Sequence, residues 1–394
     1  MRIAYVLDTF PKLSETFILR EIQELERQGH DLHFFALNRP AQQFDENVQA
    51  YEQRTFYRPS VFSTSFFRGR GSVLAAAGEA LPGKFSDLRS RYFANIARVF
   101  ALEMSPLGIE RIHSHFASLP ALLGALAAEC LDAKFSFSAH ANDVFVNPEL
   151  LDWKTARADL VLTCNRAAHE HLLDQLPPDS RSKVRLVHHG IDLSGRSFDE
   201  KEDVEKPRQI LSVGRLEEKK GFDDLLRAAK LLHQDGAEFH LQVVGDGGLR
   251  NALEDLRSEL GLDEQVEFLG ALPNTEVWGL LERAHLFALA SRQTADGDRD
   301  GIPNVLLEAA VAGVPIVATR AGSIPELLGD DENGLLAPPS QPDVLSQCLS
   351  RLMTDPDLRQ RLRKSAYQKV QQEFNLQANV AAMTRLFEHP PVSK

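Results

Sequence analysis

The sequence has few cysteines, and their spacing does not predict disulfide bonds between them. Only Cys130, Cys164 and Cys348 occur in 394 residues, far apart and without a C-x-x-C pair. A disulfide framework or a structural zinc site needs closely spaced sets of such residues. Three isolated thiols therefore disfavour both kinds of site and fit a protein of the reducing cytoplasm.

The chain also lacks a long apolar run. No stretch reaches the roughly 18 apolar residues that a membrane-spanning helix needs. The N-terminus reaches Asp8 too soon for the apolar core of a signal peptide. We therefore expect a cytoplasmic protein without a transmembrane segment.

The sequence also has fewer basic than acidic residues. The formal net charge is -12 at pH 7, whereas proteins that bind the nucleic-acid backbone broadly present a basic face. This deficit argues against nucleic acid as a partner. Any phosphate that the protein binds must be held by a local group of cations.

Apolar runs typical of strands alternate with amphipathic helical stretches along the whole chain. This alternation predicts an α/β fold with parallel sheets covered on both faces. At this length we expect two doubly wound domains, with a charged linker over 192–208 between a first domain, 1–195, and a second, 208–375. The predicted strands cover 3–7, 32–37, 112–115, 135–138, 160–163, 184–187, 210–213, 239–244, 266–269, 286–290, 316–318 and 334–336.

Two cations stand in a loop of the second half. Arg215 and Lys220 lie in the segment 214–221, which follows the apolar run 210–213 and precedes a helical pattern from Phe222. Loops from strand to helix are the usual place for phosphate recognition in open α/β sheets. A guanidinium fork and a compact ammonium suit a diphosphate, although a solvated basic loop would look the same.

Two carboxylates flank a turn further along. Asp300 precedes Gly301, Ile302 and Pro303, and Glu308 follows within the helical pattern that Asn304 opens. The start of such a helix offers free N–H groups and the positive end of its dipole to an anion. An N-cap with a solvated acid after it is the alternative interpretation.

Taken together, these residues resemble the donor-binding half of family 4 retaining glycosyltransferases, and the stretch from Ser291 to Ala312 is most similar to exopolysaccharide or colanic-acid-type members. The resemblance implies the GT-B fold, in which two Rossmann-like domains face a central cleft and the helix 376–394 packs back on the first domain. It implies a hexosyltransferase-type glycosyltransferase (EC 2.4) that uses a nucleotide-diphosphate sugar as donor and no cofactor or metal. The acceptor would be a saccharide or a polyprenyl-linked saccharide.

The resemblance also assigns roles to residues. Catalytic roles fall to His140, Asp300, Arg215 and Lys220, with the two cations on the diphosphate, Asp300 near the transferred sugar and Glu308 on the ribose. The donor contacts that it implies are Arg215, Lys220, Gly245, Gly247, Gly301, Ile302, Pro303, Asn304 and Glu308. The family usually has glutamate where Asp300 stands, so the reach toward a sugar hydroxyl is altered here, and Asp296 or Asp298 is a candidate to compensate.

The first domain offers candidates of its own. Ser14 and Glu15 follow the first strand, where a helix cap explains Ser14 equally well. His140 follows the predicted strand 135–138, and its place in a His-x-x-Asp segment with Asp143 resembles the family. His113 and His115 are packing or acceptor-side groups, and we count His115, with Ser14, Glu15 and Asp143, on the acceptor side. No histidine spacing here matches a metal motif.

Basic and aromatic residues mix in the irregular stretch 51–111, most densely from Phe62 to Arg98. Such a mixture suits peripheral contact with an anionic membrane, here the inner face of the plasma membrane. A pair of core helices with solvated basic faces is the other interpretation.

Three other functions fit a two-domain α/β chain. A nicotinamide-dependent dehydrogenase is disfavoured because Arg250 stands where the third glycine of Gly-x-Gly-x-x-Gly would follow Gly245 and Gly247. A sugar-nucleotide 2-epimerase of the same fold and a non-catalytic nucleotide-sugar-binding protein stay open.

Overall fold

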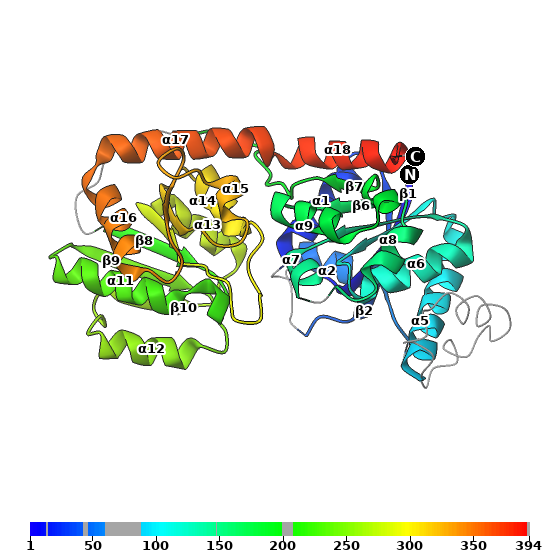
Figure 1. The fold of residues 1–394 in the computed structure, drawn as a ribbon, viewed down its shortest axis with the longest axis horizontal. Helices are drawn as coiled ribbons and strands as arrows, with labels where there is room; N and C mark the ends of the chain where they lie inside the picture. Colours follow the sequence, from blue (N-terminus) through cyan, green and yellow to red (C-terminus); the bar gives the residue numbers. More distant parts are fainter. Residues whose placement is uncertain (13–14, 42–45, 60–87, 147, 199–207, 392–394) are drawn as a thin grey trace. The chain divides into compact units, whose positions relative to one another are not determined.

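The computed structural model describes the chain except residues 13–14, 42–45, 60–87, 147, 199–207 and 392–394. Contacts within the chain divide it into two units. The first comprises residues 1–164, 168–189 and 376–394, and the second comprises residues 165–167 and 190–375. Each unit is a parallel sheet with helices on both faces (Figure 1).

The first unit contains a seven-stranded sheet in the order β3-β2-β1-β4-β5-β6-β7. All its pairings are parallel, as expected where helices connect successive strands. The strands are β1 (Arg2–Thr9), β2 (Asp31–Asn38), β3 (Thr55–Tyr57), β4 (Arg111–His115), β5 (Lys134–Ala139), β6 (Leu160–Thr163) and β7 (Val184–Leu186). The helices are α1 (Thr16–Arg27), α2 (Glu46–Gln53), α5 (Leu88–Met104), the short 3-10 helix η3 (Ser105–Leu107), α6 (Leu119–Leu131), α7 (Ala141–Phe145), α8 (Leu151–Arg157), α9 (Arg166–Gln175), α10 (Pro178–Arg181) and α18 (Leu376–Glu388).

Burial on both faces explains why the sequence of strand β1 is apolar almost throughout. Ala4 and Val6 pack into the core under α5 and α6, whereas Ile3, Tyr5 and Leu7 pack into the core under α1 and α18. Successive side chains of a strand point to opposite faces. A strand that is buried on both faces therefore cannot alternate between apolar and polar residues.

The second unit repeats this architecture with six strands in the order β10-β9-β8-β11-β12-β13. The strands are β8 (Arg208–Val213), β9 (Phe239–Val244), β10 (Val266–Gly270), β11 (Leu286–Leu289), β12 (Ile316–Thr319) and β13 (Leu335–Ala337). The helices are η4 (Glu218–Lys220), α11 (Phe222–Gln234), α12 (Arg250–Glu259), α13 (Asn274–Arg283), α14 (Asn304–Val311), α15 (Ile324–Leu327), α16 (Pro342–Thr354) and α17 (Pro356–Glu373). Neighbouring residues Ile210 and Leu211 of β8 again enter separate cores.

All twelve predicted strands are confirmed, with ends that differ by a residue or two. Sequence analysis missed β3, a short edge strand inside the stretch that we read as irregular. Residues 190–195, which we expected in the first domain, group with the second unit. The reason is that Ile191 bridges to Asn375 and is buried in a core of that unit.

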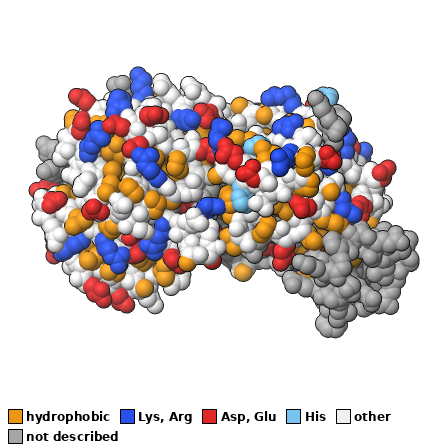
Figure 2. All heavy atoms as spheres, in the orientation of Figure 1, with side chains coloured by type: hydrophobic (Ala, Val, Ile, Leu, Met, Phe, Trp, Pro, Cys, Tyr) orange, Lys and Arg blue, Asp and Glu red, His pale blue; other side chains and the backbone are white. Residues whose placement is uncertain are grey.

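Charge is spread over the surface in both signs. On the face shown in Figure 2, basic and acidic side chains of the described residues are interspersed, consistent with the argument against a nucleic-acid partner. Among the helices that the structure describes, none is long and apolar enough to cross a bilayer.

Helix α18 is held in the first unit by a buried arginine. Arg111 is fully buried and forms a two-pronged ion pair with Asp159, at 2.7 and 2.8 Å. One of its nitrogens also donates to the Phe387 carbonyl of α18 at 2.9 Å, and its guanidinium lies 5.0 Å from the Phe387 ring centroid. The terminal helix thereby depends on a strand more than 270 residues earlier.

We expect Arg111→Met to lower the free energy of unfolding of the first unit by about 2 to 3 kcal/mol, because it leaves Asp159 and a helix carbonyl without a buried partner. The two tryptophans allow a local measurement, since Trp153 lies in the first unit and Trp278 in the second. Denaturant unfolding followed by Trp153 fluorescence in a Trp278→Phe background reports the first unit. Arg2→Met is the matched control, because Arg2 forms an exposed pair with Glu110 and should matter little. Equal losses in the two variants would contradict this role of Arg111.

Candidate functional site

The candidate residues of the second unit gather where the strand order of its sheet reverses. Strand β8 lies between β9 and β11, and the chain leaves β8 at Val213 and β11 at Leu289. Ligands of open α/β sheets bind outside the carboxyl ends of the strands at such a switch point. The loops 214–221 and 290–303 are therefore the candidate donor site.

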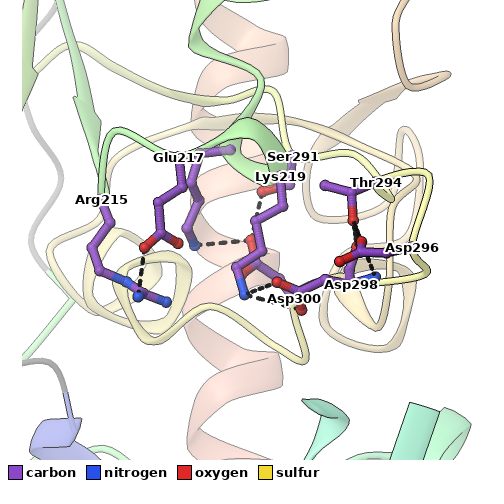
Figure 3. A network of polar contacts seen from close by, with 9 residues as sticks. Arg215, Glu217, Lys219, Ser291, Thr294, Asp296, Asp298 and Asp300 are labelled. Carbon is purple, nitrogen blue, oxygen red and sulfur yellow. Dashed lines mark hydrogen bonds and ion pairs between the residues drawn. The ribbon is translucent and has the colours of Figure 1, made fainter. Parts of the chain in front are cut away.

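Lys220 and Asp300 form the central contact of these loops. Lys220 Nζ lies 2.8 Å from Asp300 Oδ2. Ser291 Oγ donates to the same oxygen at 2.8 Å, as Figure 3 shows. The two charged side chains are only 11% and 10% exposed. Burial alone would raise the pKa of Asp300, but Lys220 and then Ser291 outweigh burial and hold this pKa below its usual value. The structure thus fixes an ionised carboxylate and an ammonium group at the switch point.

Arg215 is placed differently in the same loop. Its Nη1 donates to Glu217 Oε1 at 2.7 Å, as Figure 3 shows, but its side chain is 57% exposed. An exposed pair of this kind is held weakly. Arg215 can therefore exchange Glu217 for an anionic ligand at little cost.

The acids near Asp300 have partners of their own. Asp298 pairs with Lys219 at 2.9 Å, and Asp296 accepts a hydrogen bond from the Thr294 hydroxyl. Figure 3 shows both side chains directed to these partners. Both acids are therefore already paired, and compensation by either for the shorter Asp300 stays a prediction.

Glu308 occupies a separate position. It lies on α14, is buried, and has an oxygen 3.4 Å from Asn274 Nδ2 of α13. Helix α14 begins at Asn304 after Pro303, so Gly301 and Ile302 lead directly into its first turn. Asp300 and Glu308 thus contact side chains of different elements, which suits different roles in one site.

Close packing between two loops explains why glycine is needed at positions 245 and 247. Gly245 has a φ of +138°, and a Cβ there would lie 1.9 Å from the Gly214 carbonyl oxygen. A Cβ on Gly247 would lie 2.6 Å from the Leu216 carbonyl oxygen. Both glycines are needed for the loop after β9 to pack against the loop after β8, whereas their approach to the donor stays a prediction.

A second group of polar residues is buried in the first unit, around its own switch point between β1 and β4. Tyr5 donates from its hydroxyl to Glu21 Oε1 at 2.8 Å, and His115 Nε2 lies 2.8 Å from the same oxygen. His115 Nδ1 lies 3.3 Å from His140 Nε2, and His140 Nδ1 lies 3.7 Å from the Cys164 sulfur. A continuous chain of polar contacts therefore runs from α1 to His140.

Two further histidines surround this chain. The ring nitrogens of His113 lie 2.9 and 3.1 Å from the hydroxyls of Ser136 and Ser138. His189 stacks on His140 with 5.2 Å between centroids and 12° between the ring planes. The candidate His140 is thus held on all sides by residues of several strands and loops.

Burial controls the charge of this cluster. It lowers the pKa of His113 and of His189 to about 3, and it holds the pKa of His140 well below its usual value, with the neighbouring histidines adding to the effect. Burial would raise the pKa of Glu21, but His115 outweighs it and the pKa falls to about 2. The lowered pKa values disfavour charge on the rings of His113, His140 and His189, while the carboxylate of Glu21 stays ionised.

Asp143 orients the loop that carries His140. Its Oδ2 accepts hydrogen bonds from the backbone N–H groups of Ala117, at 2.7 Å, and His140, at 3.1 Å. Burial raises the pKa of Asp143 to about 6 despite these bonds. Asp143 thus bonds to the backbone and His115 is fully buried, and their acceptor-side roles stay predictions.

The other acceptor-side candidates lie at the start of α1. Ser14 is outside the described residues. Glu15 precedes the first helical residue, Thr16, and pairs with Lys12 at 2.5 Å. Its side chain is partly exposed, so contact with an acceptor stays a prediction.

Sequence analysis missed Glu21, although a signal for it existed. Glu21 lies on the same face of α1 as Ile18, Ile22 and Leu25, all of which are buried. A charged residue on the apolar face of an amphipathic helix needs a buried partner. That partner, His115, comes from another element and could not be identified from spacing.

Two sets of described residues bring metal-ligating atoms within 4.8 Å of one another. One is Glu21, His113 and His115, and the other is His140, Cys164 and His189. In the first set the facing atoms already hydrogen-bond to protein groups. In the second, the rings of His140 and His189 are nearly parallel, so their in-plane lone pairs do not converge on one point. Neither set is a preformed metal site.

Comparison with known proteins agrees with this architecture. Residues 14–194 match the model of glycosyltransferase family 4, and residues 195–369 match that of the group 1 glycosyl transferases. The chain is 27% identical to the amylovoran biosynthesis glycosyltransferase AmsK of Erwinia amylovora, over 95% of this chain and 96% of that protein. It is 28% identical to the putative colanic acid biosynthesis glycosyltransferase WcaL of Escherichia coli K12, over 96% of this chain and 97% of that protein.

The fold is also that of a solved structure, Alr3699/HepE of Anabaena, crystallised with UDP and glucose. The TM-score is 0.73 with 16% identity, over 98% of this chain and 99% of that one. Neither a dehydrogenase, an epimerase nor a non-catalytic protein is favoured by these relatives. With two matched models that together span nearly the whole chain, the protein belongs to glycosyltransferase family 4 and has the GT-B fold.

Proposed function

We propose that this glycosyltransferase moves a hexosyl group, with retention of configuration, from a nucleotide-diphosphate sugar to a saccharide or lipid-linked saccharide in bacterial exopolysaccharide synthesis. The observation that carries the donor assignment is the buried pair of Lys220 and Asp300 at the switch point of the second sheet. The names of AmsK and WcaL support the pathway class. The UDP and glucose in HepE support a sugar nucleotide as donor.

In this proposal the protein stabilises the leaving diphosphate by fixed positive charge. Asp300 holds the ammonium of Lys220 in place, so little reorganisation is needed when charge develops on the phosphate. Arg215 leaves its exposed contact with Glu217 and adds a second cation. The N–H groups of Gly301 and Ile302, at the start of α14, complete the set, and the mechanism uses no metal.

In this proposal, retention proceeds by attack on the face from which the diphosphate leaves. The bond between the anomeric carbon and the diphosphate oxygen breaks, and the acceptor oxygen bonds to that carbon on the same face. The proton of the acceptor hydroxyl passes to the departing phosphate. His140 lies beside the transferred sugar in this proposal, and Glu15 lies on the acceptor side.

In this proposal, the two carboxylates bind different parts of the donor. Asp300 contacts the transferred sugar while Glu308, on α14, binds the ribose of a UDP- or GDP-sugar.

A peripheral contact with an anionic membrane would bring a polyprenyl-linked acceptor within reach. Much of the basic and aromatic stretch from Phe62 to Arg98 falls outside the described residues, and its last part forms α5.

We expect Arg215→Ala and Lys220→Ala each to lower the transfer rate by roughly two to three orders of magnitude, since each removes a preorganised cation from the leaving group. Lys219→Ala is a matched control. It removes the same charge from the same loop, but the proposal gives Lys219, which pairs with Asp298, no contact with the diphosphate, so its loss should be far smaller.

The assay is release of nucleoside diphosphate from the nucleotide-sugar that the wild type turns over, with circular dichroism to check folding. The wild-type rate should also survive EDTA. Wild-type turnover in either folded alanine variant would contradict the diphosphate role. A rate that EDTA abolishes and Mg²⁺ or Mn²⁺ restores would contradict stabilisation by Arg215 and Lys220 alone.

Calorimetric titration separates the roles of the carboxylates. Glu308→Ala should weaken the nucleoside diphosphate and the donor equally, whereas Asp300→Ala should weaken the donor more than the nucleoside diphosphate, which loses only the support that Asp300 gives to Lys220. Each affected complex should lose roughly 1.5 to 3 kcal/mol, as for one hydrogen bond to a charged group. Equal losses for the two ligands in Asp300→Ala would make Asp300 a nucleotide contact or a partner of Lys220 only.

Sedimentation with liposomes tests the membrane contact. The protein should pellet with anionic vesicles at low salt and return to the supernatant as salt screens its basic residues. Vesicles of neutral lipid are the control. Recovery in the supernatant with both kinds of vesicle at low salt would remove peripheral attachment from the proposal.

A further inference from the structure

The backbone of Phe116, the residue after strand β4, is strained. Its φ of +72° lies in the left-handed region, which bulky residues rarely adopt. We propose that Lys154 is a positioning residue for the transfer reaction: it holds the peptide after Phe116 in place and thereby keeps the Phe116 ring against His140. The inference rests on the proposed function only in placing His140 beside the transferred sugar.

The strain comes with a specific ring contact. Glycine would adopt such a φ without steric cost, but this chain has phenylalanine, whose ring centroid lies 4.5 Å from that of His140. The rings of His189 and Phe17 lie farther off, at 5.2 and 5.3 Å. Strained residues persist only where their surroundings fix them, and they cluster at functional sites. The groups that fix Phe116 therefore bear on the position of His140.

Two buried side chains hold the next residue, Ala117, at both of its polar backbone groups. Its N–H donates to Asp143 Oδ2 at 2.7 Å, and its carbonyl accepts a hydrogen bond from Lys154 Nζ. Lys154 and Asp143 are only 2% and 4% exposed. The Ala117 N–H belongs to the peptide plane that follows Phe116, and the carbonyl belongs to the next plane. With both planes fixed, the Phe116 backbone cannot relax without breaking a buried hydrogen bond.

The same contacts join three elements around His140. Asp143 Oδ2 also accepts a hydrogen bond from the His140 N–H at 3.1 Å, so one oxygen joins the loop after β4 to the loop after β5. Lys154 adds helix α8. Burial lowers the pKa of Lys154 to about 8, and the Asp143 carboxylate opposes that shift. An amine donates a hydrogen bond whether it is protonated or not, so the contact with Ala117 does not depend on the charge of Lys154.

Loss of the Lys154 contact would leave the buried Ala117 carbonyl without this partner and allow the strained backbone to relax. A change of φ at Phe116 would redirect its Cα–Cβ bond and move the ring away from His140. The imidazole would then be less precisely placed for a bound sugar, and small errors of placement lower the rate of reaction. In this way Lys154 acts on the reaction through Phe116, without touching the substrate.

Lys154→Met tests the contact directly, because methionine keeps most of the side-chain length and removes the donor. Hydrogen exchange followed by mass spectrometry should be faster, by roughly tenfold or more, in peptides that contain the Ala117 amide. Lys183→Met is the matched control. Lys183 Nζ donates to the Ala156 carbonyl of the same helix at 2.8 Å, so the control removes a bond of the same kind and should leave exchange at Ala117 unchanged. Unchanged exchange in Lys154→Met would overturn the inference.

Kinetics show whether the contact serves the reaction. In Lys154→Met we expect kcat for the nucleotide-sugar that the wild type turns over to fall roughly ten- to a hundredfold, with unchanged affinity for nucleoside diphosphate, which the proposed donor site in the second unit binds. Phe116→Gly removes the ring and the strain but leaves the buried polar groups in place, so it should lower kcat to a similar extent. In that background Lys154→Met should lower kcat by less than about twofold further, since the two residues act as one unit. Additive losses would show that Lys154 acts by another route and would overturn the inference.

The same variants separate this inference from the proposed function. Faster exchange with a wild-type kcat in folded Lys154→Met would overturn the positioning role. A wild-type kcat in Phe116→Gly would do the same, even if Lys154→Met did not fold. Failure of the proposed function would appear in the wild type itself, as no turnover of any nucleotide-sugar, whereas failure of this inference appears only in the comparison of variants.

Discussion

The ion pair of Lys220 and Asp300 is the contact on which the candidate donor site depends. It joins the loop after β8 to the loop after β11 across a separation of 80 residues, at the point where the sheet reverses its strand order. Both side chains are nearly buried, so breaking the pair would leave an isolated charge in the protein. The pair therefore also fixes the two loops, from which Arg215 and the start of α14 approach the same place.

The two units use buried charge in different ways. The second keeps a complete pair, in which the ammonium is held ready for an anion and the carboxylate stays ionised because of it. The first keeps an ionised glutamate and satisfies it with contacts from Tyr5 and His115. A fixed charge suits the stabilisation of a leaving diphosphate.

Most strands and several candidate site residues could be predicted from the sequence, for identifiable reasons. Strands buried on both faces are continuous apolar runs, so all twelve were found, and candidates such as Arg215, Lys220 and His140 stood out because they follow such runs directly. The pairing of Lys220 with Asp300 could not be predicted, because it depends on which loops the strand order brings together. Glu21 was missed because a single glutamate in an amphipathic helix looks solvated, and β3 because three residues at a sheet edge leave little pattern.

The measurement that bears most directly on the central claim is a hydrolysis screen with a panel of UDP- and GDP-sugars, followed by NMR of the products. The account predicts slow turnover of a sugar nucleotide into nucleoside diphosphate and free sugar, with the sugar released first as the anomer present in the donor. It would be contradicted if no member of the panel released nucleoside diphosphate, if the sugar appeared first as the opposite anomer, or if the product were a sugar epimerised at C2.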